Sequence, residues 1–433
     1  MHEAPGTLLA KRPRDPAYPR PEETLIGHTM AVVSAAKTIV ESISDSIEVT
    51  FNIGQPDLVF IEKAVLRAAL LHDFGKANSQ FQRMMLGKGD SKQALRHEWI
   101  SAWLPLYCGE FADWLFGKDR KLRDVVLSAV LGHHLKSEDG GSIDVRNGSG
   151  DTQLRCYWGH QDFVCCLREA RVDIGLADNI PSLNDVGLDL TNRPLAELRR
   201  WFCKRLQKSR TLPIVKSLLM AADIVGSALP VKHELKIKDW ITKTLGRRCD
   251  SKSLQNIAQK RLADNSPRDF QREVESTSHR VLLVRAGCGS GKTIAAYLWA
   301  AKRANGRKLF ICYPTTGTAT EGYRDYIISS DFERNSALLH SRREIDIEYV
   351  LEAEARRETR EAGLGIAALV SWDVPLVVCT VDTVLGIIQN SRRSLYSSPA
   401  FMNAAFVFDE IHQYDERLFG ALLRFIETFK GTS

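Results

Sequence analysis

The sequence of 433 residues lacks several features that mark special classes of protein. Its apolar runs, such as residues 404–408, are far shorter than the roughly 20 residues of a membrane-spanning helix. No basic region followed by an apolar stretch stands at the start, so a secretory signal peptide is not indicated. The nine cysteines include no Cys-x-x-Cys pair, which argues against a disulfide framework or a thiolate zinc site. These absences favour a soluble protein of a reducing cytoplasm.

A strong excess of one charge is also missing. The net charge of +6 comes from 59 Lys and Arg against 53 Asp and Glu, which is too small by itself to indicate a nucleic-acid partner. Residues 267–433 hold 21 charges of each sign, so the whole excess, 38 against 32, lies in residues 1–266. The content of 44% hydrophobic and 26% charged residues is typical of globular proteins. Length predicts two or three domains.

Up to about residue 245, apolar residues recur with the period of a helix. The clearest segments are residues 25–43, 58–71, 125–131 and 195–206. We predict an all-α domain over residues 1–245. The polar, basic stretch 246–266 predicts a linker or a bridging helix.

After residue 267 the pattern changes to short β-branched runs that alternate with helical segments. The predicted strands are residues 281–285, 309–313, 376–380 and 406–408. The predicted helices between them include residues 293–303 and 344–362. Apolar strands that alternate with helices form a parallel sheet covered on both faces. Residues 267–433 are therefore predicted to form a separate α/β domain.

A glycine-rich loop follows the predicted strand 281–285. Its residues are Ala286, Gly287, Cys288, Gly289, Ser290, Gly291, Lys292 and Thr293. Backbone N–H groups of such a loop and the N-terminus of the next helix bind phosphate. Lys292 would reach the β and γ phosphates and Thr293 would ligate Mg²⁺, although Ala286 replaces the usual first glycine. The loop predicts binding of ATP with Mg²⁺ in preference to a chance glycine turn.

Asp409 and Glu410 follow the predicted strand 406–408. An Asp at a strand end beside a phosphate loop holds Mg²⁺, and the adjacent Glu activates the attacking water, whereas a lone Asp-Glu pair is usually a helix cap. With the loop, the sequence Asp-Glu-Ile-His resembles superfamily 2 helicases. Arg268 and Gln271 resemble the adenine-reading Q motif of that family. Residues 313–316 and 378–382 resemble its segments that contact nucleic acid.

Histidines and aspartates occupy apolar helical contexts in the first region. They are His28, His72, Asp73, His97, His133, His134 and Asp223. This ligand set suits Mn, Fe, Co or Ni, with Mg as a further candidate, and a shared carboxylate can bridge two ions. A lone histidine there is more often a hydrogen-bonded core residue, but paired imidazoles and buried charge are costly without a ligand. Lys76, one helical turn beyond His72 and on the same helix face, is predicted to steady a phosphate or a bound water.

The run His72-Asp73-Phe74-Gly75-Lys76 resembles the H-D-x-x-K core of HD-domain metal-dependent phosphohydrolases. Together with residues 96–98, 132–134 and 222–227, it is similar to the nuclease domain of the CRISPR-associated type I nuclease-helicases. That family fuses an HD nuclease to a superfamily 2 helicase in the order seen here. The resemblance spans nearly the whole chain.

The resemblance implies a metal held by His28, His72, Asp73 and Asp223, and a second held by His97, His133 and His134 with Asp73 bridging. It also implies catalytic roles for Asp73 and Lys76 in cleaving DNA and for Glu410 in ATP hydrolysis. The implied substrate is single-stranded DNA, and the implied partner is an RNA-guided surveillance complex of the Cascade type. The expected setting is antiviral defence in a prokaryotic cytoplasm.

Two other interpretations stay open at this stage. The first is an HD-type nucleotide phosphohydrolase with an accessory P-loop domain, which the second histidine set disfavours because such enzymes often use one ion. The second is a non-enzymatic docking subunit, which the intact ligand set disfavours. The sequence shows no second RecA-like lobe with an arginine finger, which contributes about 10³ to 10⁵ in rate. We therefore expect ATP binding with slow hydrolysis.

Overall fold

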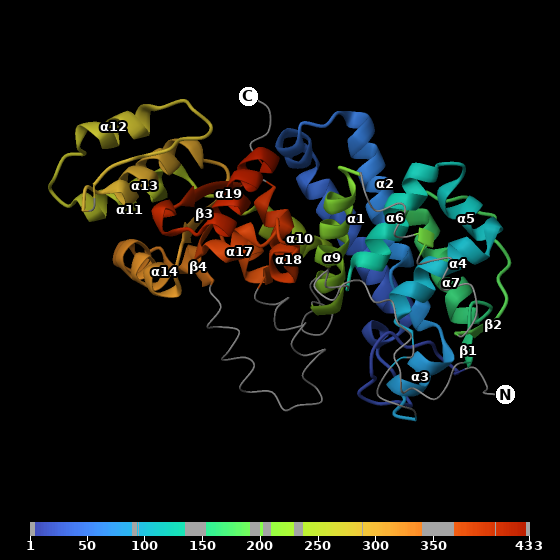
Figure 1. Ribbon diagram of the computed structural model, residues 1–433. Helices are drawn as coiled ribbons and strands as arrows, with labels where there is room; N and C mark the ends of the chain where they lie inside the picture. Colours follow the sequence, from blue (N-terminus) through green and yellow to red (C-terminus); the bar gives the residue numbers. More distant parts are fainter. Residues whose placement is uncertain are drawn as a thin grey trace. The chain divides into compact units, whose positions relative to one another are not determined.

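The computed structural model describes residues 5–88, 93, 95–134, 153–190, 200–201, 209–228, 237–287, 289–339, 368–402 and 404–429. The chain divides into two compact units (Figure 1). One contains residues 1–40 and 56–238, and the other contains residues 41–55 and 239–433. Residues 344–362 and nearly all of residues 195–206, both predicted as helices, lie outside the described residues. The domain boundaries at 245 and 267 stay predictions.

The first unit is mainly helical, as predicted. Its helices are η1 (Pro21–Glu23), α1 (Leu25–Phe51, in this unit to residue 40), α2 (Gln55–Leu71), η2 (Phe74–Lys76), α3 (Ser79–Met85), α4 (His97–Tyr107), α5 (Gly109–Phe116), α6 (Arg120–Gly132), α7 (Gln161–Asp173) and α9 (Leu212–Ala228). The antiparallel pair β1 (Gln153–Cys156) and β2 (Val186–Asp189) was not predicted, because four-residue strands carry too short an alternation. Among the described residues, no helix is long and apolar enough to cross a membrane.

Helix α6 illustrates how the sequence builds this unit. The Asp119 side chain accepts a hydrogen bond from the backbone N–H of Leu122 at 2.9 Å, which caps the helix start. Val126 and Val130, four residues apart, are fully buried. Helix α6 packs against α4 and α9, and α4 packs against η2. The elements that carry the predicted metal ligands are therefore neighbours.

The second unit contains a four-stranded parallel sheet. Its strands are β3 (Lys308–Tyr313), β4 (Ser336–Leu339), β5 (Leu376–Thr380) and β6 (Ala404–Phe408), in the order β4-β5-β3-β6. The helices are α10 (Ile237–Gly246), α11 (Ser251–Leu262), α12 (Asp269–Ser276), α13 (Lys292–Arg303), α14 (Thr316–Gly322), α17 (Val381–Leu385), α18 (Arg392–Phe401) and α19 (Glu416–Phe429). Short helical turns, η4 (Tyr323–Ile327), η5 (Ile328–Ser330), η6 (Glu333–Asn335) and η7 (Ile411–Gln413), complete it.

Side chains of β3 alternate between the two faces of the sheet. Leu309 and Ile311 join the core formed with α11 and α13. Phe310, between them, contacts the ring of Phe401 of α18 at 5.1 Å between centroids. Helices therefore cover both faces, and the predicted α/β fold with a parallel sheet is confirmed.

The predicted strand at residues 281–285 is wrong. These residues pair with no strand in the described part of the chain, and Val281 and Leu283 are 53% and 67% exposed. Their β-branched and apolar composition is typical of a strand, but hydrogen bonds to a neighbouring strand define one. The loop that follows is thus positioned by α12 and α13 and not by a strand before it.

The stretch 246–266 differs from a free linker. It contains α11, whose Leu254, Ile257 and Ala258 are buried in the core of the second unit. These three residues follow the i, i+3, i+4 spacing of one helix face, although the rest of the segment is polar. Residues 251–262 thus belong to the core beneath α13.

Lys308 is the most deeply buried cation described in the second unit, with 1% of its surface exposed. Its ammonium donates to the carbonyl oxygens of Thr244 at 3.1 Å, Trp372 at 2.6 Å and Val374 at 2.9 Å. Burial, assisted by the positive charge of Arg248, lowers the pKa of Lys308 to about 7. The three acceptors offset part of this cost, so the lysine ties α10 and the segment before β5 to the sheet.

We predict that Lys308→Met destabilises the protein by about 1–3 kcal/mol, because three buried carbonyl groups lose their donor. Urea unfolding followed by circular dichroism measures the change. The control is Lys302→Met, which removes a lysine that is 47% exposed and pairs with Glu275 at 3.4 Å. It is expected to change the unfolding free energy by less than about 0.5 kcal/mol. Equal losses in both variants would contradict the role given to Lys308.

Candidate metal centre and nucleotide-binding loop

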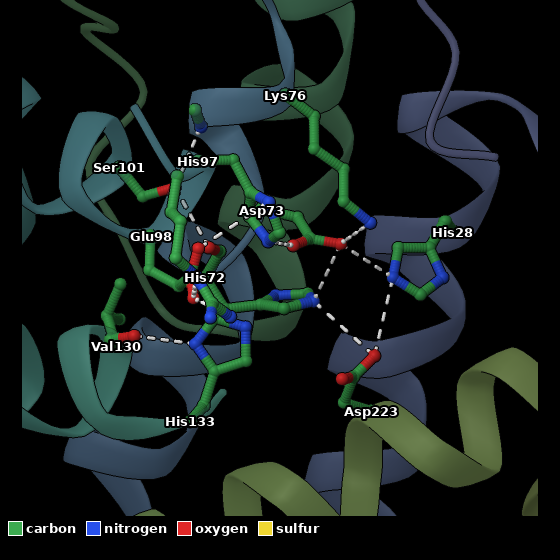
Figure 2. Close-up of polar contacts among 12 residues, drawn as sticks. His28, His72, Asp73, Lys76, His97, Glu98, Ser101, Val130, His133 and Asp223 are labelled. Atoms are coloured by element: carbon green, nitrogen blue, oxygen red, sulfur yellow. Dashed lines mark hydrogen bonds and ion pairs between the residues drawn. The ribbon is translucent and has the colours of Figure 1, made fainter. Parts of the chain in front are cut away.

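The structure brings all seven predicted metal ligands together in the first unit, as Figure 2 shows for six of them. They come from His28 in α1, His72 and Asp73 between α2 and η2, His97 at the start of α4, His133 and His134 after α6, and Asp223 in α9. Residues at or near the ends of α1, α2, α4 and α6, together with one residue inside α9, thus surround one point.

Two glycines allow these elements to approach closely. A Cβ atom at Gly75 would lie 1.9 Å from the backbone oxygen of His97, so the turn after Asp73 touches the start of α4. A Cβ atom at Gly226 would lie 2.7 Å from the side chain of Val32, which brings α9 against α1. A larger residue at Gly75 or Gly226 would push apart the helices and turns that carry the predicted ligands.

Asp73 lies at the centre of the cluster. Its Oδ2 atom is 3.0 Å from Nε2 of His28 and 3.2 Å from Nε2 of His72. Its Oδ1 atom is 3.1 Å from Nε2 of His97 on the other side. The two carboxylate oxygens therefore face two different groups of histidines, which is the arrangement of a bridging ligand.

Two overlapping groups of side chains have the compactness of metal sites. One consists of Asp73, His97, His133 and His134, and the other of His28, His72 and Asp73, with all ligand atoms of a group within 4.8 Å of one another. Oδ1 of Asp223 lies 3.5 Å from Nε2 of His28 and extends the second group. The residues match the two predicted sets, while their role as ligands stays a prediction.

Several donor atoms of the centre are buried without hydrogen-bond partners, as expected for the ligands of a metal ion. Nε2 of His28, His72, His97 and His133 is buried in each case and makes no hydrogen bond of acceptable geometry. Oδ1 of Asp73 is likewise buried and makes no hydrogen bond of acceptable geometry. Buried polar atoms without partners are costly, and several around one point indicate a bound cation.

Burial controls the protonation of most of these histidines. It lowers the pKa of His28 to about 4, lowers that of His133 to about 4, and holds that of His134 well below its usual value. Burial also opposes a charge on His72, but the two carboxylates beside it outweigh burial and raise the pKa of His72 to about 10. Neutral imidazole binds metals, so an ion that enters at His72 displaces a proton.

Lys76 reaches the centre by a different route from the one predicted. Helix α2 ends at Leu71, and Lys76 lies in η2, so the helical spacing from His72 does not apply. Its Nζ atom is 2.7 Å from Oδ2 of Asp73. Burial would raise the pKa of Asp73, but the charges of His72 and Lys76 lower it well below its usual value. The carboxylate of Asp73 is therefore kept ionised.

Two further residues of the centre were not predicted from sequence. Ser101 accepts a hydrogen bond from the N–H of Gly75 at 2.7 Å and donates to the backbone oxygen of His72 at 2.9 Å, which fixes the turn between them. Glu98 is fully buried beside His97. The available signal was a charged residue in the first turn of the otherwise apolar helix α4.

In the second unit, the phosphate-loop residues lead directly into α13. Gly289 and Gly291 have φ angles of +70° and +88°, which only glycine adopts without strain. Nζ of Lys292 donates to the backbone oxygens of Ala286 and Gly287 at 3.2 and 3.1 Å. The backbone oxygen of Ser290 accepts from Arg268 at 2.7 Å. Cys288 lies outside the described residues.

Gln271 holds the loop from the side of α12. Its Oε1 accepts from the N–H of Arg268 at 2.8 Å and its Nε2 donates to the backbone oxygen of Gly291 at 3.0 Å. The residue is 1% exposed. Both ends of the side chain thus bind backbone, and contact with adenine stays a prediction.

The acidic pair after β6 meets the start of α13. The hydroxyl of Thr293 donates to Oδ2 of Asp409 at 2.9 Å, so the two predicted Mg²⁺ ligands are in contact although 116 residues separate them. Glu410 adopts a left-handed backbone conformation with φ of +52°, which is rare for a residue with a side chain. Its carboxylate lies 3.2 Å from Nδ1 of His412. Thr293, Asp409 and Glu410 therefore lie together where β6 ends.

A histidine and aspartate centre on helices, together with a parallel sheet that carries a phosphate loop and a DExH sequence, defines an HD-type domain fused to a helicase lobe. Residues 10–228 match the family Cas3, HD domain, and residues 268–431 match the family DEAD/DEAH box helicase. The first match covers 219 of the 433 residues, and the chain belongs to the Cas3 family. The family predicted from the sequence is confirmed.

Known proteins support this assignment. The chain is 38% identical over 440 residues to a protein of Myxococcus xanthus assigned as a CRISPR-associated nuclease/helicase Cas3, which covers 98% of this chain and 58% of that protein. A protein of Methanocaldococcus jannaschii with the same assignment is 22% identical, over 83% of this chain and 51% of its own length. The chain thus spans just over half the length of these relatives.

Solved structures share the fold. The crystal structure of T. fusca Cas3-AMPPNP aligns with a TM-score of 0.54 at 16% identity, covering 98% of this chain and 49% of that one. The crystal structure of T. fusca Cas3 aligns with a TM-score of 0.53 at 18% identity, over 94% and 47% of the two chains. The order of a helical unit and a sheet-containing unit is therefore that of Cas3.

We predict that the protein binds two divalent ions and that Asp223→Ala weakens the binding of only one of them. The substitution removes the carboxylate next to His28 and His72 and leaves Asp73, His97, His133 and His134 unchanged. Metal content after equilibration with Mn²⁺ and gel filtration is expected to fall from about two ions per chain toward one. An unchanged content of two ions would contradict the placement of Asp223 in the site.

Proposed function

We propose that this chain is a metal-dependent nuclease that cleaves single-stranded DNA at the centre around Asp73, coupled to an ATP-binding helicase lobe, in CRISPR antiviral defence. The observation that carries the proposal is the pair of compact ligand groups that share Asp73. Two ions bridged by a carboxylate, when bound, supply the charge that stabilises the attacking and leaving oxygens of a phosphodiester. Mn, Fe, Co and Ni suit the histidine-rich set, and Mg is a further candidate.

The side chains of the centre have distinct parts in this reaction. His28, His72 and His97 direct their Nε2 atoms toward the carboxylate of Asp73. Asp73 stays ionised because Lys76 and His72 stabilise its charge. The Lys76 ammonium, whose side chain is 12% exposed, adds positive charge where a phosphate group would bind.

Nucleotide binding by the second unit is proposed on separate grounds. The contact between Thr293 and Asp409 forms a Mg²⁺ site at the end of the phosphate loop, and Lys292 begins the helix that follows. Glu410, in its left-handed conformation beside them, is the candidate that orients and deprotonates water.

The names of the relatives support the proposed partner and substrate. They are assigned as CRISPR-associated nuclease/helicases, and an RNA-guided complex that opens a DNA duplex makes a displaced single strand available. We propose a surveillance complex of the Cascade type as the partner. The net charge of +6 is compatible with a groove that follows a DNA backbone.

Cleavage assays with a metal series test the proposal. The purified chain is incubated with Mn²⁺, Co²⁺, Ni²⁺ or Mg²⁺ and with labelled single-stranded DNA, duplex DNA or dNTPs, each with and without ATP. We expect single-stranded DNA to be cleaved and cleavage to stop with EDTA. Phosphate release from dNTPs with intact DNA would replace the nuclease proposal by a nucleotide phosphohydrolase. The absence of bound metal and of cleavage would instead favour a docking subunit.

We predict that Asp73→Ala and Lys292→Ala separate the two activities. Asp73→Ala removes the bridging carboxylate, so DNA cleavage should fall by more than about 100-fold, because changes behind metal ligands alone cost about 10- to 100-fold. ATP binding should be unchanged in this variant. Lys292→Ala should weaken binding of a fluorescent ATP analogue and leave metal-dependent cleavage intact. If either variant lost both activities, the cause would be misfolding and the assignment of separate sites would fail.

A further inference from the structure

Two of the ring nitrogens that face away from the centre are held by backbone carbonyl groups. Nδ1 of His72 donates to the backbone oxygen of Ala69 at 2.8 Å, and Nδ1 of His133 donates to the backbone oxygen of Val130 at 2.6 Å (Figure 2). A carbonyl oxygen only accepts hydrogen bonds, so each ring carries its proton on Nδ1. Nε2 is therefore the atom that carries the lone pair when the ring is neutral, and it is the atom available to an ion beside Asp73.

His97 lacks this backbone partner. Its Nδ1 atom is buried and makes no hydrogen bond of acceptable geometry in the described structure. The group it faces is the carboxylate of Glu98, whose Oε2 atom lies 3.6 Å away. That oxygen is also buried and without a hydrogen bond. A donor and an acceptor of complementary chemistry therefore lie opposite each other, slightly beyond bonding distance.

Arg96 binds the other oxygen of the Glu98 carboxylate. Oε1 of Glu98 accepts from Nε of Arg96 at 2.7 Å and lies 2.6 Å from its Nη2. A fully buried carboxylate that served only this ion pair could turn both oxygens to the guanidinium, which is the usual fork geometry. Here one oxygen is left for His97. The carboxylate thus connects an outer arginine to an inner candidate ligand.

We infer that Glu98 is a positioning residue, which accepts a hydrogen bond from Nδ1 of His97 and fixes the tautomer that directs Nε2 toward the ion beside Oδ1 of Asp73. A carboxylate behind an imidazole makes the ring a stronger ligand than a backbone carbonyl does. Of the two groups, the one that contains His97 would thus hold its ion more tightly. This inference depends on the proposed two-metal centre and concerns the affinity of one of its two sites.

The test is metal binding by the full chain, not activity. Protein freed of metal by chelation is titrated with Co²⁺ alone, and isothermal titration calorimetry gives the number of ions and the dissociation constant of each. We predict that Glu98→Gln keeps two ions and weakens one site by about 10- to 100-fold, with the other unchanged. Glutamine keeps the size and a hydrogen bond acceptor but removes the charge.

A matched control comes from the same unit. Oδ2 of Asp162 lies 3.9 Å from Nδ1 of His160, a histidine outside the centre that accepts from the N–H of Asp162 and contacts the backbone oxygen of Pro5. Asp162→Asn also removes a carboxylate beside a histidine, and it should leave both dissociation constants unchanged. A loss in this variant equal to that of Glu98→Gln would attribute the effect to general destabilisation and overturn the inference.

A double variant distinguishes positioning from direct ligation. If Glu98 acts through His97, Glu98→Gln costs no further affinity in a His97→Ala background, because the ring it positions is gone. A further loss there would mean that Glu98 binds the ion itself or supports the fold, and it would overturn the inference. Unchanged affinities in Glu98→Gln would do the same. A wild-type chain that binds fewer than two ions would reject the two-metal proposal itself, a result separate from these.

Discussion

The buried carboxylate of Asp73 is the constraint around which the first unit is arranged. A carboxylate without exposure is stable as an anion only if cations and donors surround it, and here His28, His72, His97 and Lys76 do so. These groups come from α1, from α4 and from the segment 72–76, so these three parts of the chain must come together before the charge is balanced. The negative charge of Asp73 is costly to bury during folding, and the same charge would attract metal ions to the centre.

The identity of the centre could be predicted from sequence because its residues lie in short motifs. His72 and Asp73 are adjacent, and paired imidazoles at His133 and His134 are unusual in an apolar context. The supporting contacts could not be predicted in this way. That Gly75 touches His97, or that Glu98 turns one oxygen inward, depends on how η2 and α4 pack, and no local pattern encodes it.

The fold shows a similar division. Strands β3, β5 and β6 were predicted because each is a short apolar run within a unit of alternating strands and helices. Residues 281–285 have the same composition but no pairing, since a strand depends on its neighbour as much as on itself. Conversely, the segment that contains α11 was interpreted as a linker or a bridging helix, because only one face of the helix is apolar, and that face meets α13.

Lys308 has a consequence for how the protein is made. Its ammonium cannot be buried until its acceptors have assembled, and Thr244 and Trp372 lie 64 residues before and after it along the chain. Val374 is more distant still. During synthesis the lysine must therefore stay hydrated until the ribosome has released residues well beyond it. The interior of the second unit is completed late, by a segment that reaches the sheet only after β3 and everything before it have emerged.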